Sequence, residues 1–465
     1  MNKTSVYFLI FAVAVFVSFF AIKSHFSLQT TGLILFILVF VPVLIKPDIG
    51  LIVIIASMLF SPEIVMGRTS TSGRYVTIRI EDILLLVVIF AWLLRTSFTK
   101  DIASTFRTKL TGPFFLYIVA CMVSTSLAVM GTGIDIKQSL LSILKYCEYF
   151  LLFLMVRDSI TNIGQAKMYA VVFLLTAVVV ATQSNAYIQN QLSAGTRFFR
   201  VAPPVETTNV GESGTLGGYI VFMTAIAGGL LLNLRSMTVR VFLLCLILVM
   251  FRAFLYTLSR GSYVAMVPMV IGLACFTRKN KLILISGVVI GLVMLTVFAP
   301  HMIKERVTTT VVEKSGISGK YLELEASPAD RLESWKAVLF TLFPRKPIFG
   351  WGVARGFIDG QIFLTLFEVG AVGLFLFVSV LVKLYKMARS VLILKEVQSD
   401  DFTAGLSVGF MAGYIGLLGH ALSTNTFIII KIMEPFWFIA AIVLSLPHLL
   451  EQEKLAKSVG GGRYS

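Results

Sequence analysis

Charged residues and cysteines are both scarce in this sequence. Asp, Glu, Lys and Arg make up 14% of the 465 residues, whereas soluble domains carry roughly a quarter. The four cysteines lie inside apolar runs without paired spacing, so we expect no disulfide framework. The four histidines are scattered and no HExxH or CxxC pattern occurs, so we expect no metal and no other cofactor.

Long apolar runs fill the sequence instead. Hydrophobic residues make up 57% of it, and the charges cluster between runs of about 17 to 25 residues, the length that spans a bilayer as a helix. We therefore predict an all-α fold, a polytopic transmembrane helical bundle of about 12–14 spans, allowing for short or re-entrant segments. The candidate spans are 6–23, 29–45, 49–61, 81–95, 113–130, 140–156, 167–185, 215–233, 240–257, 262–276, 281–299, 361–382, 404–423 and 427–449.

The chain has no soluble domain between these runs and no internal repeat at a fixed period. We expect residues 1–465 to form a single integral membrane domain. Within it, residues 300–360 are expected to form an extracytoplasmic loop subdomain and residues 450–465 a cytoplasmic tail. The first run follows Lys3 directly and no small-residue cleavage site comes after it, so we expect a retained helix.

Basic residues gather in every second loop. The positive-inside rule places these loops in the cytoplasm, together with both termini. The same loops explain the formal net charge of +16, so we expect membrane lipids as partners and no nucleic acid. The clusters are Lys46; Arg95, Lys100, Arg107 and Lys109; Arg157 and Lys167; Arg235 and Arg240; Arg278, Lys279 and Lys281; Lys383, Lys386, Arg389 and Lys395; and Lys454 and Lys457.

The longest loop on the other side contains SPADRLESWKAVLFTLFPRKPIFGWG. Ser327 is a suitable cap for a helix that begins at Pro328, and Asp330 suits the positive end of its dipole. Leu332, Trp335, Leu339 and Leu342 recur on one face. We predict an amphipathic helix that lies on the outer membrane surface or on the bundle and ends at Pro344.

Arginines break the charge rule on this outer side, where they do nothing for topology. They are Arg197, Arg200, Arg260, Arg331, Arg345 and Arg355. A guanidinium is a planar fork of donors that pairs bidentately with phosphate and stays protonated. Several of them on one face suit a diphosphate whose lipid tail lies in the bilayer, and they favour its departure as negative charge develops.

Structural interpretations stand beside the functional ones. Arg260 can extend to the membrane interface, as long basic side chains do at helix ends. Arg197 and Arg200, in TRFFRVAPP, can anchor the chain at the interface with their phenylalanines. Lys431 and Glu434 stand at i, i+3 spacing, and we expect them to neutralise each other as a structural pair.

Two further arginines have alternatives of the same kind. Arg331 can pair with Asp330 or Glu333 on its own helix, or with lipid headgroups. Arg252 lies inside a span, two helical turns before Arg260 and so on nearly the same face. An intramembrane arginine is a functional candidate by default, although a buried structural pair is the other possibility.

Several stretches together resemble the O-antigen ligase and polymerase family of bacterial cell-surface polysaccharide assembly. The serine-arginine-glycine turn LSRGSYVA opens a span, and RLESWKAVLF is followed by the proline-glycine-x-glycine pattern PIFGWG. The segments DGQIFLTLFEVGAVG and GESGTLGGYIVF, and more weakly EPFWFIAAIVLSL, also match. The resemblance covers roughly residues 190–445 and rests on the order and outer placement of these stretches.

This resemblance implies an inverting, metal-independent membrane glycosyltransferase of the GT-C type. Such an enzyme takes a glycan from undecaprenyl diphosphate at the periplasmic face of the bacterial inner membrane. The acceptor is a lipid A core sugar in ligases and another lipid-linked repeat unit in polymerases. By resemblance, Arg260 and either Arg197 or Arg200 hold the donor diphosphate, while Arg331 supports the loop or touches the glycan.

The sequence departs from the family at one position. Typical ligases have a histidine about nine residues before a glutamate, and here Asp359 stands at that place before Glu368. Asp359 can act as the general base that takes the proton of the attacking hydroxyl, or it can simply cap the following helix. The absence of the histidine favours a polymerase or a less typical member over a lipid A core ligase.

Two other functions remain open at this point. A transporter, such as a flippase for the same lipid-linked sugars, also has many spans and internal charges. It predicts two similar halves with paired broken helices, and the sequence has no such symmetry. A noncatalytic scaffold of a polysaccharide complex would not require the outer arginines.

Overall fold

The computed structural model describes residues 46–461 apart from short gaps. The gaps are 62, 69–74, 100–104, 133, 135, 197, 205–212, 299–310, 317–318, 325 and 357. The predicted spans 6–23 and 29–45 and the candidate Arg197 therefore lie outside the described residues.

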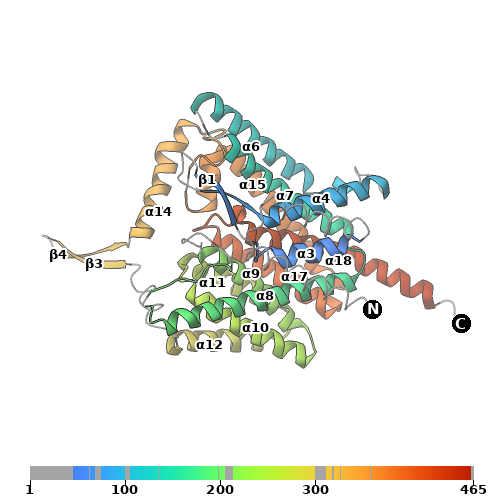
Figure 1. The fold of residues 1–465 in the computed structure, drawn as a ribbon. Coiled ribbons are helices and arrows are strands. Elements are labelled where there is room, and N and C mark those ends of the chain that lie inside the picture. Colours follow the sequence, from blue (N-terminus) through green and yellow to red (C-terminus); the bar gives the residue numbers. More distant parts are fainter. Residues whose placement is uncertain are drawn as a thin grey trace.

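The described chain is an all-α bundle of roughly aligned helices (Figure 1). Eight described helices are long and apolar enough to cross a membrane, as expected for a multi-pass membrane protein. They are α6 (Thr111–Thr132), α7 (Ile136–Ser159), α8 (Ile163–Ser193), α9 (Ser213–Asn233), α10 (Met237–Tyr256), α15 (Gln361–Ile393), α17 (Asp401–His420) and α18 (Ile430–Gly461). The predicted spans within these residues all fall on helices.

The remaining elements are shorter. The other helices are α3 (Pro47–Ser57), α4 (Ile80–Thr99), α11 (Arg260–Phe276), α12 (Lys281–Phe298), α14 (Ala326–Ala337) and α16 (Lys395–Ser399). Two antiparallel hairpins pair β1 (Glu63–Arg68) with β2 (Tyr75–Arg79) and β3 (Val311–Gly316) with β4 (Gly319–Leu324). These hairpins are additions to the all-helical prediction. Because they are two-stranded, the bundle remains the fold.

Helices α9, α17 and α18 form the centre of the bundle. In their most apolar segments 94%, 83% and 89% of the residues are buried, whereas the share is only 28% in α10. A Cβ on Gly229 of α9 would collide with the backbone of Gly405 on α17, and one on Gly409 would lie 2.8 Å from the Ala225 oxygen. Small residues on both helices thus let two backbones touch, which is how membrane helices pack closely.

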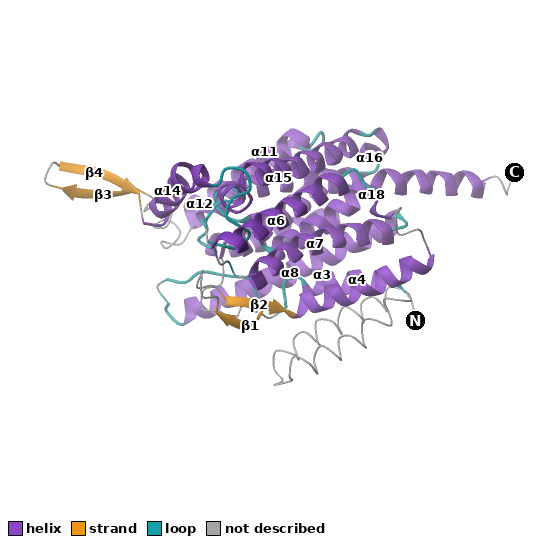
Figure 2. Cartoon of the chain, turned by 90° about the horizontal axis from the view of Figure 1, so that it is seen from above, coloured by secondary structure: helices purple, strands orange, loops and turns teal. Residues whose placement is uncertain are grey.

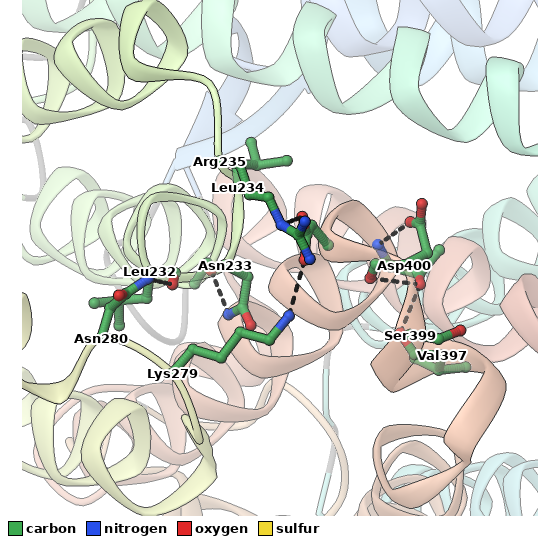
Figure 3. A network of polar contacts seen from close by, with 12 residues as sticks. Leu232, Asn233, Leu234, Arg235, Lys279, Asn280, Val397, Ser399 and Asp400 are labelled. Carbon is green, nitrogen blue, oxygen red and sulfur yellow. Dashed lines mark hydrogen bonds and ion pairs between the residues drawn. The ribbon is translucent and has the colours of Figure 1, made fainter.

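One end of the bundle collects the basic loops. Asp401, at the start of α17, binds Arg235 of the α9–α10 loop and Lys279 of the α11–α12 loop, each at 2.8 Å (Figure 3). Lys454 near the end of α18 lies 3.7 Å from Glu396 of α16. These loops therefore lie at one end of the molecule, as the charge pattern predicts. That this end faces the cytoplasm stays a prediction.

The opposite end carries α14 and both hairpins (Figure 2). The amphipathic helix predicted from Pro328 begins at Ala326, so Ser327 is its second residue and does not precede it as a cap. Its α-helical part ends at Ala337, and a π-helix (η1, Val338–Leu342) and a 3-10 turn (η2, Phe343–Arg345) follow. The regular helix thus ends before Pro344, which has no N–H to continue it.

Helix α15 is interrupted inside the bundle. Gly370 has φ 68° and ψ −165°, which leaves several backbone groups of the helix without their usual partners. The preceding loop replaces those partners: Trp351 N donates to Phe367 O at 2.9 Å, and Ala371 N donates to Pro347 O at 2.8 Å. Such irregular backbone is stable at membrane depth only where other protein groups satisfy it.

Candidate functional site

Four segments that are far apart in the sequence meet at the end of the bundle opposite the basic loops. They are residues 198–204, 256–261, 358–361 and 421–428. Hydrogen bonds join them: Val201 N to Tyr256 O at 3.0 Å, Gln361 N to Ala421 O at 2.9 Å, and Asn425 Nδ2 to Ile358 O at 2.9 Å. The folding of the bundle therefore brings the Arg200 segment, the Arg260 turn and the Asp359 segment to one end of the molecule.

Arg260 opens α11 at this meeting point. Helix α10 ends at Tyr256, Leu258 turns the chain with φ 50°, and Ser259 caps the new helix by accepting from Ser262 N at 3.4 Å. A Cβ on Gly261 would collide with the Ser423 hydroxyl. Gly261 therefore lies in close contact with the α17–α18 loop, and the neighbouring Arg260 is half-buried.

The second half of the site is an ion pair at the start of α15. Arg331 Nε lies 2.9 Å from Asp359 Oδ2, with 31% and 26% of the two side chains exposed. Trp335, one helical turn after Arg331, donates its indole N–H to Asp359 O and stacks on Phe363 at 4.7 Å. The predicted alternative, a pair with Asp330 or Glu333, is replaced by this contact between α14 and α15.

The α17–α18 loop lies between the two halves. On one side it touches Gly261, through Ser423 and Thr424. On the other side, a Cβ on Gly360 would lie 2.9 Å from Leu422 O. Gly360 has φ 94°, so glycine is required there both for backbone conformation and for space. Gly261, next to Arg260, and Gly360, next to Asp359, therefore contact the same three-residue stretch, 422–424.

Asp359 does not cap α15 through its side chain. The residue before the helix is Gly360, and its carbonyl accepts from Leu364 N at 3.0 Å. The carboxylate of Asp359 instead binds Arg331 and is partly exposed. Of the two roles that the sequence offered, a base or a helix cap, the side-chain cap is therefore excluded and the base stays a prediction.

Arg200 is exposed next to the Arg260 turn. Its guanidinium lies 5.5 Å from the Phe198 ring, and the adjacent Phe199 stacks on Tyr256 at 5.5 Å. Phe199 thus holds this loop against the end of α10, and the alternative that Arg200 anchors the chain at the membrane interface stays a prediction. Val201, next to Arg200, donates its N–H to Tyr256 O at 3.0 Å. The Arg200 segment is therefore bound to the chain four residues before Arg260.

Arg252 is not on the face that the sequence suggested. Because α10 ends at Tyr256 and α11 begins after a turn, Arg252 and Arg260 do not share one helix. Arg252 is exposed and donates to Asn185 Oδ1 on α8 at 3.2 Å, so it lies along the side of the bundle. The expectation that it continues the Arg260 face was wrong.

Arg355 lies in the loop that satisfies the broken helix. Its guanidinium is 5.2 Å from the Trp351 ring, and Lys346 lies 4.7 Å from the same ring. Trp335 and Trp351 pack against one small hydrophobic cluster that includes Val338 and Phe367. Arg355 is therefore connected to the Arg331–Asp359 pair through shared packing and not by a direct contact.

Sequence reasoning missed a buried polar group next to Arg260. His420 places Nε2 3.1 Å from Ser262 Oγ and Nδ1 2.8 Å from Thr426 Oγ1, and all three side chains are fully buried. In the sequence, His420 is only one of four scattered histidines. The available signal was a lone histidine that ends an apolar run just before the polar stretch Ser423–Thr426.

Within the part of the chain that the structure describes, no group of three or more His, Cys, Asp or Glu side chains is arranged to hold a metal ion. Comparison of the sequence with family models and with curated proteins gave no match.

Proposed function

We propose that this chain is a membrane glycosyltransferase that uses a glycan linked to a polyprenyl diphosphate. The observation that carries the proposal is that the Arg260 turn and the segment of the Arg331–Asp359 pair both contact the α17–α18 loop, while the Arg200 segment is hydrogen-bonded to the end of α10 just before Arg260. These side chains lie at the bundle end with few basic loops, where arginine is not explained by topology. Three of the stretches that resemble the O-antigen ligase and polymerase family contribute to this place: LSRGSYVA with Arg260, RLESWKAVLF with Arg331 and DGQIFLTLFEVGAVG with Asp359.

The proposed reaction is an inverting displacement at the anomeric carbon. An acceptor hydroxyl oxygen attacks that carbon, and the bond between the carbon and the diphosphate oxygen breaks with its electron pair going to the diphosphate. Arg260, with Arg200 beside it, stabilises the developing negative charge. Asp359 takes the proton of the acceptor hydroxyl, and Arg331 is a positioning residue that holds the carboxylate through their 2.9 Å contact.

The proposed setting is the periplasmic face of the bacterial inner membrane, with both termini in the cytoplasm. The donor is a glycan on undecaprenyl diphosphate, the acceptor is a glycan or a second lipid-linked unit, and lipids surround the bundle. The aspartate at position 359 in place of the ligase histidine favours an O-antigen or exopolysaccharide polymerase over a ligase.

One observation favours a second candidate, a flippase for lipid-linked oligosaccharides. The break of α15 at Gly370 is the kind of discontinuous helix that transporters use at their substrate sites. Purified protein in detergent separates the two functions, because transport across a membrane has no meaning there whereas glycan transfer does.

The direct test is to incubate the purified protein with a lipid-linked repeat unit alone and to follow chain length on a gel. Chain extension without a second acceptor identifies a polymerase. Reaction that begins only when another acceptor glycan is added identifies a ligase. No transfer under either condition, from protein that moves the lipid in vesicles, would favour the flippase.

A further inference from the structure

A line of hydroxyl and imidazole groups leads from the bundle interior to the Arg260 turn. Thr426 Oγ1 contacts His420 Nδ1 at 2.8 Å, and His420 Nε2 contacts Ser262 Oγ at 3.1 Å. Ser262 Oγ then donates to Ser259 Oγ at 2.8 Å. The first three side chains are fully buried, whereas Ser259 is partly exposed. Ser259 is therefore the group of this line that a ligand at Arg260 can reach.

The hydrogen-bond inventory fixes where the Ser259 proton points. A serine hydroxyl has one proton to donate and two positions at which it accepts. Ser259 Oγ accepts from Ser262 Oγ and also from Ser262 N, at 2.8 and 3.4 Å, so both accepting positions are used. Among the described residues no side chain or carbonyl accepts the Ser259 proton, which leaves it available as a donor.

The same inventory assigns one tautomer to His420. Because Ser262 donates its proton to Ser259, its oxygen accepts from His420, so Nε2 carries the ring proton. Nδ1 is then bare and accepts from the Thr426 hydroxyl at 2.8 Å, a much shorter contact than the 3.4 Å one between that hydroxyl and Thr424 O. The Gly214 backbone also lies within hydrogen-bonding reach of the ring. The proton direction is thus set by a fully buried imidazole that cannot rotate without losing its partners.

We infer that Ser259 donates its hydroxyl proton to an oxygen of the donor diphosphate beside Arg260, and that His420 is the positioning residue that directs this proton outward. The inference rests on the proposed function and names a further ligand of the same site. A hydroxyl that donates to an anionic oxygen makes a short, charge-assisted hydrogen bond, stronger than one between neutral groups.

A catalytic Ser–His pair is a different reading of the same contacts. A nucleophilic serine must give its proton to the histidine and face the substrate. Ser262 does neither, because it is fully buried and donates to Ser259. The geometry therefore points to orientation of a binding group and not to covalent catalysis.

The line also joins the two halves of the site. Thr426 is followed by Phe427, whose N–H donates to Gln361 Oε1 at 3.0 Å, and Gln361 opens α15 two residues after Asp359. His420 thus connects the Arg260 turn to the helix start that holds Asp359. This arrangement keeps the diphosphate ligands at a constant position relative to the base.

Binding of farnesyl diphosphate and of farnesol to the purified full-length protein in detergent tests the inference. We expect Ser259→Ala to weaken farnesyl diphosphate binding about tenfold or more, the effect of losing a hydrogen bond to a charged group, with farnesol binding unchanged. Ser259→Thr keeps a hydroxyl and should restore most of the affinity. Ser259→Gly removes the hydroxyl while keeping a good capping residue, which guards against a folding defect.

The role of His420 is tested by a double-mutant cycle. His420→Phe should weaken farnesyl diphosphate binding severalfold alone but add little to Ser259→Ala, because both act through one proton. The matched control is His448→Phe, whose histidine bonds Gln452 in the C-terminal part of α18 and should leave binding unchanged.

Failure of this inference is distinguishable from failure of the proposed function. Wild-type protein that prefers farnesyl diphosphate over farnesol, with Ser259 variants that bind both as the wild type does, overturns the inference alone. Equal loss of both ligands in Ser259→Ala and Ser259→Gly also overturns it, because that is a structural defect. Wild-type protein without any preference for the diphosphate, and without glycan transfer, removes the proposed function itself.

Discussion

At the scale of single residues, the Arg331–Asp359 contact orients the Asp359 carboxylate and contributes little to the stability of the fold. Both side chains are about a quarter to a third exposed, and ion pairs of that kind contribute only about 0–1 kcal/mol to folding. The pair also depends on Trp335, which donates to the Asp359 carbonyl from the same helix as Arg331. Two contacts from one helix thus hold one carboxylate in place.

Replacing Asp359 by asparagine should therefore separate activity from folding. We expect Asp359→Asn to lower glycan transfer at least about a hundredfold, the usual contribution of a general base, with a melting temperature within a few degrees of wild type. Transfer by purified protein and thermal unfolding in detergent are the two measurements. Asp330→Asn, on the exposed side of the same helix, is the control and should retain activity. Full activity in Asp359→Asn would remove the carboxylate from the mechanism.

Lys431 is a charged residue whose surroundings the sequence described only in part. Its side chain is fully buried, Glu434 is 2% exposed, and Glu81 of α4 is also 2% exposed and interacts with Lys431 electrostatically. Lys431 thus interacts with a carboxylate of a second helix, and the expected Lys431–Glu434 pair within α18 stays a prediction. Spacing along one helix cannot reveal a partner that the fold brings from another.

Removing the positive charge of Lys431 should destabilise the protein. We expect Lys431→Met to cost up to about 3–5 kcal/mol, because it removes a cation that acts on the buried Glu81 and leaves that carboxylate mainly with its Arg79 contact at 3.4 Å. Thermal unfolding in detergent measures the loss. Lys395→Met replaces an exposed lysine and should have little effect. Unchanged stability in Lys431→Met would mean that Arg79, and not Lys431, compensates Glu81.

At the scale of elements, the helices were predictable and the break in α15 was not. A run such as Gln361–Ile393 is apolar over more than a bilayer thickness, and this property alone predicts a spanning helix. The interruption at Gly370 depends on the backbone of residues 347–352 binding alongside it. The hydropathy of a segment does not predict which other backbone will bind to it. Glycine is also common in spanning helices, so Gly370 by itself does not indicate a break.

Filling this break with a side chain should destabilise the bundle. Gly370 has φ 68°, and a Cβ there would collide with the Ile348 carbonyl. We expect Gly370→Ala to cost at least about 1–3 kcal/mol through the strained backbone alone. Gly131→Ala is the matched control, because Gly131 lies in α6 with open space around its Cβ position and should tolerate alanine or gain stability. Equal stability of the two variants would contradict the broken-helix geometry.

The turn at Arg260 was predictable from the sequence, but its consequences for Arg252 and His420 were not. The serine and glycine beside Arg260 indicated a tight turn, and the structure confirms one between α10 and α11. The same turn separates Arg252 from Arg260. Helical periodicity could not predict this separation, because it assumes one continuous helix through both residues. His420 was missed because its partners, Ser262 and Thr426, lie on different segments that meet only in the folded bundle.

At the scale of the whole molecule, charge sorts the two ends. Arg235 and Lys279 converge on Asp401 at one end, while Arg260 and Arg331 lie at the other. Alternation of basic loops was sufficient to predict this sorting, since each span reverses the direction of the chain. The convergence of four loops at the other end was predicted only as a requirement of function.

Cysteine labelling tests which end faces out. In a background with the native cysteines replaced by alanine, we expect a membrane-impermeant maleimide added to spheroplasts to label Glu333→Cys on α14. Ser236→Cys, in the loop beside Arg235, should react only after the membrane is opened. Both positions are exposed, so access and not burial decides the result. The reverse pattern would place the arginine site in the cytoplasm and contradict the proposed setting.

The most direct test of the central claim is glycan transfer by purified Arg260→Ala protein supplied with a lipid-linked repeat unit. The comparison is Arg235→Ala, which removes an arginine that is 83% exposed at the opposite end of the bundle. We predict that Arg260→Ala lowers the transfer rate at least about a hundredfold, as expected when one group that stabilises developing charge is removed, while Arg235→Ala transfers glycan normally. Product chains of normal length and rate from folded Arg260→Ala protein would contradict the account.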